Sequence, residues 1–298
     1  MKVFERNAHR VMWGDCTEAL SVLIPDRSID LIFADPPYNL GKVFNGKREK
    51  WESPQAYLDW CYRWIDLCVR KLKADGSMYL MNSTQNMPYI DIYLRSKMTV
   101  LSRIVWHYDS SGVQASKYYG SLYEPILFAV MDPDHYTFNA DSVSVEARTG
   151  AVRRLIDYRK PKPAPYNSRK VPGNVWSIPR VRYRMPEYEN HPTQKPKALL
   201  QRVIAASSNE GDLVLDPFAG TFTTCVVARE LGRRSVGIEI EEEYVKIGLR
   251  RLGITAEYNG QKLERPLKTY ELSKAQLTQL EFTVREKSKS KWNTHSPR

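Results

Sequence analysis

DLIFADPPY, residues 30–38, opens with a short apolar run and stops abruptly at an aspartate and two prolines. A run of this length bounded by a turn signal is typical of a buried strand. VLDPFAGT, residues 214–221, has the same form, with a glycine at the turn before a helical segment. In open α/β sheets, ligands bind beyond the carboxyl ends of the strands. The two stretches therefore predict an α/β fold with a binding site beside Asp35 and Asp216.

Strand-like and helix-like segments alternate along most of the chain. The clearest helix starts after Ser53 with Pro54 at its first position, and apolar residues then recur every three or four positions up to Leu72. Further helices are expected at 17–23, 86–97, 196–207, 221–231 and 241–252, and further strands at 9–13, 77–81, 99–108, 123–130, 212–215 and 235–238. The alternation predicts a mostly parallel sheet with helices on both faces.

The composition excludes several classes of protein. The chain has 298 residues, 42% of them hydrophobic, and no apolar run approaches the 18 residues of a membrane span. No apolar stretch follows the basic residues near the N-terminus, so we expect no signal peptide and a cytoplasmic location. The four cysteines form no CxxC pair and no His/Cys cluster has zinc-site spacing, so no metal site is expected.

Positive charge is concentrated in one segment. The net charge is +11, and residues 141–184 contain eleven Lys or Arg against three Asp or Glu. Prolines and glycines accumulate over 131–190, where no helical or strand period persists. We interpret 131–190 as an irregular insertion that binds a polyanion, with nucleic acid favoured over an anionic membrane surface. The polar residues 255–298 are interpreted as a C-terminal extension with a mobile end.

The tetrapeptide Asp35-Pro36-Pro37-Tyr38 is a cluster of hydrogen-bond acceptors. Two prolines stiffen the backbone and remove two N–H donors, which leaves carbonyl oxygens beside the Asp35 carboxylate. An amino group with two N–H donors fits such a cluster, whereas a phosphate does not. Tyr38 adds a planar face, so the cluster suits an extruded nucleobase with an exocyclic amine. The alternative is an ordinary proline-rich turn after a strand.

The turn in residues 214–221 allows the backbone to approach a ligand closely at Gly220. Glu239 follows Asp216 by 23 residues, at the end of the next expected strand, as in α/β folds that bind a ribose through an acidic residue. The glycines do not match GxGxxG, so an adenosyl ligand without phosphate fits better than a dinucleotide, and an NAD-dependent enzyme is disfavoured. An ordinary strand–helix turn is the alternative.

A third motif, HPTQKP at residues 191–196, precedes an expected helix. The Thr193 hydroxyl, the Lys195 ammonium and the free N–H groups of the helix start would suit a carboxylate. A helix start punctuated by prolines is the alternative.

Together the three motifs resemble those of the β-class amino-methyltransferases of DNA, and among them the enterobacterial DNA adenine methyltransferases. The resemblance covers about residues 9–252, with a DPPY-type tetrapeptide ahead of the cofactor-binding motif. It implies a class I, Rossmann-like fold that depends on S-adenosylmethionine and has a circularly permuted motif order. It also implies a catalytic domain formed by residues 1–130 and 191–254, with target recognition by residues 131–190.

The resemblance assigns roles to particular residues. The catalytic residues would be Asp35, Pro36, Pro37 and Tyr38. The cofactor-binding residues would be Asp15, Cys16, Asp35, Thr193, Lys195, Asp216, Phe218, Ala219, Gly220, Thr221, Phe222, Thr223 and Glu239. The DNA-binding residues of the basic insertion would be Arg148, Arg153, Arg154, Arg159, Lys160, Arg169, Lys170, Arg180, Arg182 and Arg184. The family usually has glycine where this chain has Phe222, so that side chain is expected to narrow the loop or to line the cofactor pocket.

The implied reaction is methyl transfer from S-adenosylmethionine to N6 of adenine in double-stranded DNA, by base flipping and without a metal. N4 of cytosine is the alternative target, because the same acceptors suit a cytosine amine. RNA is disfavoured because no stacking-platform motif is visible, and a non-catalytic DNA-binding module is disfavoured because no catalytic residue is lost. The sequence leaves open the recognition sequence, a cognate restriction enzyme and the formation of a homodimer.

Overall fold

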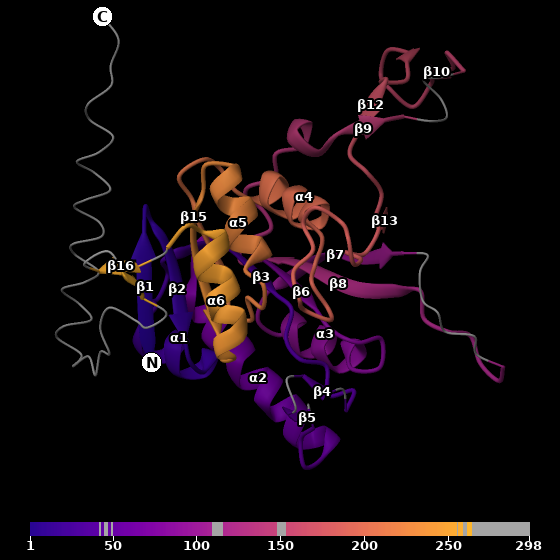
Figure 1. The fold of residues 1–298 in the computed structure, drawn as a ribbon. Coiled ribbons are helices and arrows are strands. Elements are labelled where there is room, and N and C mark those ends of the chain that lie inside the picture. Colours follow the sequence, from indigo (N-terminus) through magenta and orange to yellow (C-terminus); the bar gives the residue numbers. More distant parts are fainter. Residues whose placement is uncertain are drawn as a thin grey trace, which may run out of the picture.

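The computed structural model describes residues 1–41, 43–44, 47–48, 50–108, 116–147, 153–254, 256–258 and 261–263 of the 298. Within these residues, nine strands form one sheet in the order β1-β2-β15-β14-β3-β6-β8-β7-β13 (Figure 1). Their bounds are β1 (Lys2–Arg6), β2 (His9–Trp13), β3 (Ile29–Ala34), β6 (Leu72–Met81), β7 (Thr99–His107), β8 (Tyr123–Val130), β13 (Val175–Ser177), β14 (Leu213–Asp216) and β15 (Arg234–Glu239). All neighbours from β2 to β6 pair in parallel, whereas β1 and β8 pair antiparallel with their neighbours. The predicted mostly parallel sheet is confirmed.

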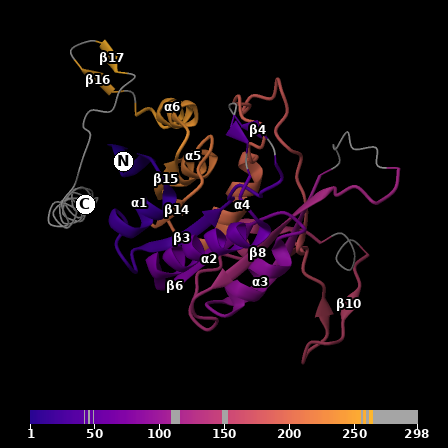
Figure 2. The same cartoon turned by 90° about the horizontal axis from the view of Figure 1, so that it is seen from below.

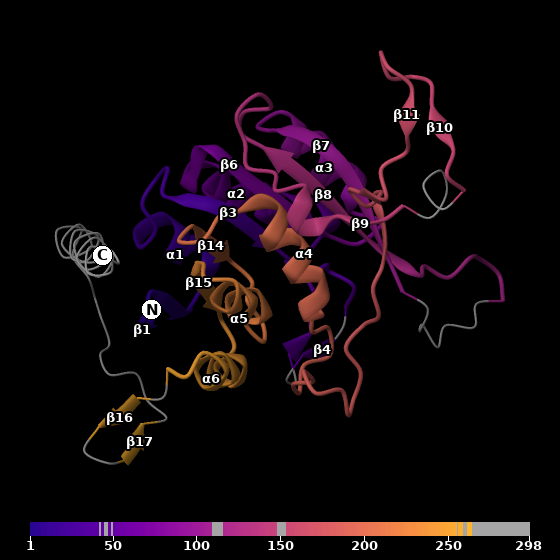
Figure 3. The ribbon, with the colours of Figure 1, turned by 90° about the horizontal axis from the view of Figure 1, so that it is seen from above.

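Helices cover both faces of this sheet, as predicted (Figures 2 and 3). They are α1 (Cys16–Val22), α2 (Pro54–Lys71), α3 (Met87–Arg95), α4 (Lys197–Ser207), α5 (Thr223–Glu230) and α6 (Glu242–Arg251). The buried side chains of α1, α2 and α3 form one core cluster, and those of α4, α5 and α6 belong to two clusters on the other face. Strand β3 contributes to both faces, because Leu31 and Phe33 point to one and Ile32 and Ala34 to the other.

The strand order reverses between β14 and β3. Leu215 of β14 pairs with Ile32 of β3, so the two strands end side by side. From β14 the chain passes through α5 to β15 on one side, and from β3 it passes through α2 to β6 on the other. The crevice at such a switch point is where open α/β sheets bind ligands.

The basic insertion is less irregular than predicted. Strand β13 pairs in parallel with β7 and extends the central sheet, with Trp176 opposite Trp106. The remaining part forms an arm (described residues 144–147 and 153–170) that projects from the body (Figures 1 and 3). The arm contains two short antiparallel pairs, β10 (Ile156–Asp157) with β11 (Ala164–Pro165) and β9 (Val145–Glu146) with β12 (Arg169–Lys170). Tertiary pairing orders these strands, which carry no sequence period of their own.

Several smaller elements complete the description. They are the 3-10 helix η1 (Asp141–Val143) and the two-stranded pairs β4 (Val43–Phe44) with β5 (Lys47–Arg48) and β16 (Ala256–Tyr258) with β17 (Gln261–Leu263). Edge strand β1 was not predicted. None of the helices in the described ranges has both the length and the apolar composition needed to cross a bilayer. Residues 264–298, most of the expected C-terminal extension, lie outside the described residues.

Candidate active site

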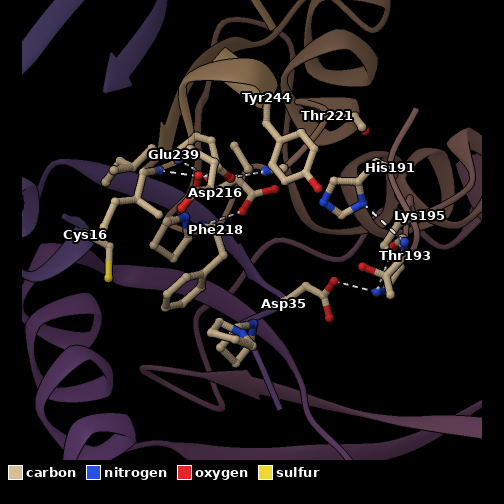
Figure 4. A pocket seen from close by; sticks show the side chains of 18 of the residues that line it. Cys16, Asp35, His191, Thr193, Lys195, Asp216, Phe218, Thr221, Glu239 and Tyr244 are labelled. Carbon is tan, nitrogen blue, oxygen red and sulfur yellow. Dashed lines mark hydrogen bonds and ion pairs between the residues drawn. The ribbon is translucent and has the colours of Figure 1, made fainter. Parts of the chain in front are cut away.

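A cavity of about 480 Å³ opens at the carboxyl ends of β3, β14 and β15 (Figure 4). All three sequence motifs contribute to its wall. Every residue predicted to be catalytic or cofactor-binding lines the cavity except Phe222. The parallel pairing of β3, β14 and β15 therefore brings together Asp35, Asp216 and Glu239, of which the first and the last lie 204 positions apart in the sequence.

Asp35 lies directly beyond β3, and both of its carboxylate oxygens have partners. The Tyr38 hydroxyl donates to Oδ1 at 2.6 Å, and the Lys195 ammonium donates to Oδ2 (Figure 4). Burial raises the pKa of Asp35, and the charge of Lys195 opposes this effect. For Lys195, burial lowers the pKa, but the carboxylates of Asp35 and Glu124 outweigh burial and raise it. Lys195 is therefore held as an ammonium ion.

Glu124 is a second carboxylate at this end of the cavity, and it was not predicted from the sequence. Strand β8 runs antiparallel to β6, so its first residues lie at the same edge as the carboxyl ends of the parallel strands. The Tyr38 hydroxyl donates to Oε2 at 3.1 Å, and Lys195 Nζ lies 3.6 Å from the same oxygen. The Tyr108 hydroxyl donates to Oε1 at 3.1 Å, and burial together with Glu124 raises the pKa of Tyr108 to about 12.

Asp216 and Glu239 form the other end of the cavity (Figure 4). Asp216 accepts the Phe218 amide at 3.0 Å and the Thr224 hydroxyl at 2.5 Å. Glu239 accepts the Gly220 amide at 2.9 Å and the amides of the two residues that follow it, at 2.8 Å each. Burial raises the pKa of both carboxyls to about 7.

Gly220 is required at its position for two reasons. Its φ is +49°, a left-handed conformation that side chains with a Cβ rarely adopt, and an added Cβ would lie 3.3 Å from Nε2 of His191. The loop therefore closes directly against the HPTQKP motif. Burial and the charge of Lys195 lower the pKa of His191 to about 4, so this imidazole is neutral at pH 7.

Asp15 and Cys16 line the cavity at the start of α1. The Asp15 carboxylate caps this helix by accepting the amides of Thr17 and Glu18. A wall of aromatic rings lies nearby, where the Trp60 ring centroid is 5.7 Å from that of Phe218 and 4.9 Å from that of Trp51. A flat heterocycle would fit against these rings.

The charges around the cavity indicate which ligand fits. Among the described residues that line it, the acidic ones are Asp15, Asp35, Glu124, Asp216, Glu239 and Glu241, and the basic ones are Lys195 and the neutral His191. A pyrophosphate would be repelled by this set. A ligand with a positive charge and hydroxyl donors matches it, as S-adenosylmethionine does with its sulfonium, its ammonium and its ribose.

Phe222 was predicted to bind the cofactor, with a side chain that narrows the loop or lines the pocket, but it lies away from the cavity. The residue has a left-handed φ of +59° and its side chain is fully buried among Val11, Cys225 and Val245. A Cβ added at Gly237 or Gly248 would collide with the ring. Glycines on β15 and α6 therefore make room for the Phe222 ring. Because the Phe222 backbone is left-handed, α5 starts only at Thr223.

Several other residues of the cavity wall were not predicted from the sequence, among them Leu40, Trp51, Trp60, Gln194 and Tyr244. Trp51 precedes the expected helix after Ser53 and Trp60 lies on it, and no spacing in the sequence connected either residue with Phe218. Tyr244 is the exception, because its place one turn into the helix after Glu239 was a usable signal.

The predicted DNA-binding residues lie in different parts of the insertion. Arg180 lies beside the cavity, with its guanidinium 4.6 Å from the ring centroid of Tyr108. Arg153, Arg154, Arg159, Lys160, Arg169 and Lys170 lie on the arm, Arg182 and Arg184 lie on the segment after β13, and Arg148 lies outside the described residues. Two arm arginines have partners within the chain, because Arg159 pairs with Asp157 at 2.8 Å and Arg169 donates to the Ser144 hydroxyl at 2.8 Å.

Known proteins share both the sequence and the fold. A family model described as DNA methylase matches residues 29–250. The chain is 58% identical over 273 residues to the DNA adenine methyltransferase YhdJ of Escherichia coli (strain K12), which covers 91% of this chain and 92% of that protein. It is 36% identical over 249 residues to the type II methyltransferase M.HpaI of Haemophilus parainfluenzae, and the aligned region covers 82% of this chain and 74% of that protein.

Two solved structures have the same fold at low sequence identity. The PvuII DNA methyltransferase (cytosine-N4-specific) matches with a TM-score of 0.62 and 17% identity, over 92% of this chain and 91% of that one. The M1.HpyAVI–SAM complex matches with a TM-score of 0.56 and 24% identity, over 81% of this chain and 98% of that one. The family model matches residues 29–250, well over half of the chain, and this range contains Asp35, Lys195, Asp216 and Glu239 of the cavity. This chain therefore belongs to the DNA methylase family of N6/N4 methyltransferases.

Proposed function

We propose that this protein transfers the methyl group of S-adenosylmethionine to N6 of adenine in double-stranded DNA. The observation that carries the proposal is the shared cavity of Asp35 and Asp216, which lie at the ends of adjacent parallel strands. An acceptor cluster for an amino group thereby lies beside an acidic site for an adenosyl ligand. The 58% identical relative is a DNA adenine methyltransferase, which supports adenine as the target.

S-Adenosylmethionine supplies the methyl group on an electrophilic sulfonium centre. Glu239 would accept the ribose hydroxyls, and the loop from Asp216 to Thr221 with Thr223 would surround the methionine and adenosyl parts. Asp15 and Cys16, near the aromatic wall, would contact the adenine ring. Thr193 would hold the methionine carboxylate. Lys195, which donates to Asp35 in this structure, would contribute positive charge to that contact.

Asp35 and the Pro36 carbonyl would orient the target amino group. The lone pair of an adenine amine is delocalised into the ring, so the amine is a poor nucleophile. Two acceptors that hold its two protons favour a pyramidal nitrogen with an available lone pair. Tyr38 would stack on the flipped base, and most of the rate acceleration would come from orientation and electrostatics.

The cytosine amine is the second candidate target, since the same acceptors fit it. The cytosine-N4-specific PvuII structure shares the fold at 17% identity, and a likeness at that level does not extend to the substrate. Sequence identity to the adenine enzyme is more than three times higher, which favours adenine.

The basic insertion is the part of the chain that would bind DNA. The exposed arm residues Arg153, Arg154 and Lys170 would contact phosphates. Arg180 lies beside the cavity and would contact the DNA near the flipped base. In this proposal residues 1–130 and 191–254 form the catalytic domain and 131–190 recognise the target, with β13 also completing the sheet.

Substitution of Asp35 tests the proposal. We expect Asp35→Ala to lower the single-turnover rate of methyl transfer from labelled S-adenosylmethionine to DNA by about a thousandfold or more. Asp30→Asn is the matched control, because Asp30 lies in β3 and contacts Lys73 and the Leu213 amide instead of the cavity. Its methylation rate should stay within about threefold of the wild-type rate. Mass spectrometry of digested DNA should identify N6-methyladenine. Unimpaired transfer by Asp35→Ala would overturn the assignment, and N4-methylcytosine as the product would favour the second target.

A further inference from the structure

Each oxygen of the catalytic carboxylate already accepts one hydrogen bond in this structure. Tyr38 donates to Oδ1 of Asp35 at 2.6 Å, and Lys195 donates to Oδ2. Each oxygen keeps a second lone pair, but a substrate amino group that donates to Asp35 competes with these two donors for position at the same carboxylate. Both lie in a buried environment, where a donor that loses its acceptor carries a substantial penalty.

Glu124 lies within reach of both donors. Its Oε2 is 3.1 Å from the Tyr38 hydroxyl and 3.6 Å from Lys195 Nζ. Each donor thus already has a second acceptor and needs only a small movement to lose Asp35 without losing a hydrogen bond. Because Glu124 comes from β8 and Asp35 follows β3, two separate strands support the two acceptors.

The position of Glu124 is itself supported from the far side. Oε1 accepts the Tyr108 hydroxyl at 3.1 Å, and the Arg180 guanidinium lies 4.6 Å from the Tyr108 ring centroid. Tyr108 follows β7, the strand that pairs antiparallel with β8. The hydrogen bond from Tyr108 holds the Glu124 carboxylate so that Oε2 faces Tyr38 and Lys195.

We propose that Glu124 is a positioning residue that accepts the Tyr38 hydroxyl and the Lys195 ammonium when a substrate amino group displaces them from Asp35. The inference rests on the proposed function, because it concerns the binding of an amino group at Asp35. Glu124 touches no reacting atom in this role. It keeps the displaced donors satisfied, and so lowers the free-energy cost of presenting Asp35 to the substrate.

The test combines Glu124 variants with Tyr38→Phe, which removes one of the two donors. We expect Glu124→Ala to lower the single-turnover methylation rate, at saturating DNA and S-adenosylmethionine, by about 10- to 100-fold. Glu124→Gln retains an acceptor oxygen and should lose less, about 3- to 10-fold. The Kd for S-adenosylmethionine should stay within about threefold in both. Glu5→Gln, at the opposite sheet edge where Glu5 pairs with Arg10 at 3.0 Å, is the control and should leave the rate unchanged.

The double variant separates this role from a merely structural one. In the Tyr38→Phe background, Glu124→Ala should cost at least about threefold less than in wild type, because one displaced donor no longer exists. Equal losses in the two backgrounds, or a wild-type rate for both Glu124 variants, would overturn the inference. If Glu124→Ala does not fold, the same comparison is made with Glu124→Gln. A wild-type protein that methylates no base would overturn the proposed function and this inference with it. Glu124 variants that methylate at the wild-type rate would overturn the inference alone.

Discussion

Asp216 lies close enough to Asp35 that the Asp35 charge adds to the effect of burial in raising the pKa of Asp216. The cause is the pairing of Leu215 with Ile32, which ends two parallel strands side by side. The acceptors for an amino group and those for an adenosyl ligand therefore belong to one electrostatic unit. Two measurable predictions concern the buried carboxylates, and two more concern Phe222 and the arm.

The first concerns the pH dependence of stability without cofactor. Burial raises the pKa of Asp216 from an ordinary value near 4 to about 7, so between these pH values the folded protein holds a proton that the unfolded chain has released. The free energy of unfolding contributed by this group therefore falls as the pH rises from about 4 to about 7. We expect Asp216→Asn to be more stable than wild type at pH 8, by roughly 1–3 kcal/mol, and equal to it at pH 4.

Urea denaturation at several pH values measures this difference. Glu243→Gln, on the exposed side of α6, is the control and should follow the wild-type curve. A lower stability of Asp216→Asn than of wild type at pH 8 would contradict the prediction.

The second concerns cofactor affinity. Burial raises the pKa of Glu239 to about 7, and hydroxyl donors favour the ionised carboxylate, so binding below pH 7 requires the loss of a proton. From pH 8 to pH 6 this one group should weaken S-adenosylmethionine binding about tenfold. In Glu239→Gln the affinity should be lower at pH 8, and that tenfold component of the pH dependence should be absent.

Calorimetric titration of wild type and Glu239→Gln with S-adenosylmethionine at several pH values tests this prediction. The ionisation of the ligand itself affects the two proteins equally, so it cancels in the comparison. Identical pH slopes for wild type and Glu239→Gln would show that Glu239 does not contact the cofactor.

The third concerns the space that Phe222 fills. Phe222→Ala should destabilise the protein by about 3–5 kcal/mol, because it leaves a cavity over Gly237 and Gly248. Gly248→Ala alone should cost about 1–3 kcal/mol, since its Cβ would collide with the ring. In the Phe222→Ala background the same change should stabilise α6, by up to about 1 kcal/mol, because alanine favours helix and the space is then free.

The effect of Gly248→Ala on stability should therefore change sign between the two backgrounds. Urea denaturation of wild type, the two single variants and the double variant measures this change. An equal cost of Gly248→Ala in both backgrounds would mean that the ring and α6 are not packed together.

The fourth concerns the arm. Replacement of Arg153, Arg154 and Lys170 by alanine should weaken DNA binding and reduce the slope of log K against log salt by about 2 to 3, close to 0.9 for each phosphate contact. Affinity for S-adenosylmethionine should not change, because the arm does not line the cavity. Lys246→Ala on α6 is the control, and it should leave the salt slope as it is in wild type. Fluorescence anisotropy with a DNA duplex over a range of salt concentrations measures the affinity for DNA and its salt slope. An unchanged slope in the triple variant would exclude the arm as a phosphate-binding element.

Local sequence patterns predicted most elements of the fold. The apolar run from Leu31 to Ala34 and the helical spacing after Pro54 depend on neighbours within a few residues, so strand β3 and helix α2 were recognisable without tertiary information. The errors arose where pairing partners are distant. Strand β13 has three residues and no period, and exists because β7 offers it a free edge.

In the site, the three motifs and their chemistry could be predicted from the sequence, because a strand end, a proline pair and a turn glycine are local features. Which side chains meet depends on the three-dimensional fold. It brought Lys195 to Asp35 across 160 positions, added Glu124 because β8 runs antiparallel, and turned Phe222 into the core against glycines of β15 and α6. Ion pairs and packing of this kind depend on three-dimensional proximity, and spacing along the chain does not encode that proximity. Asp35 was thus predicted as an acceptor, but the partners that hold it were decided by the fold.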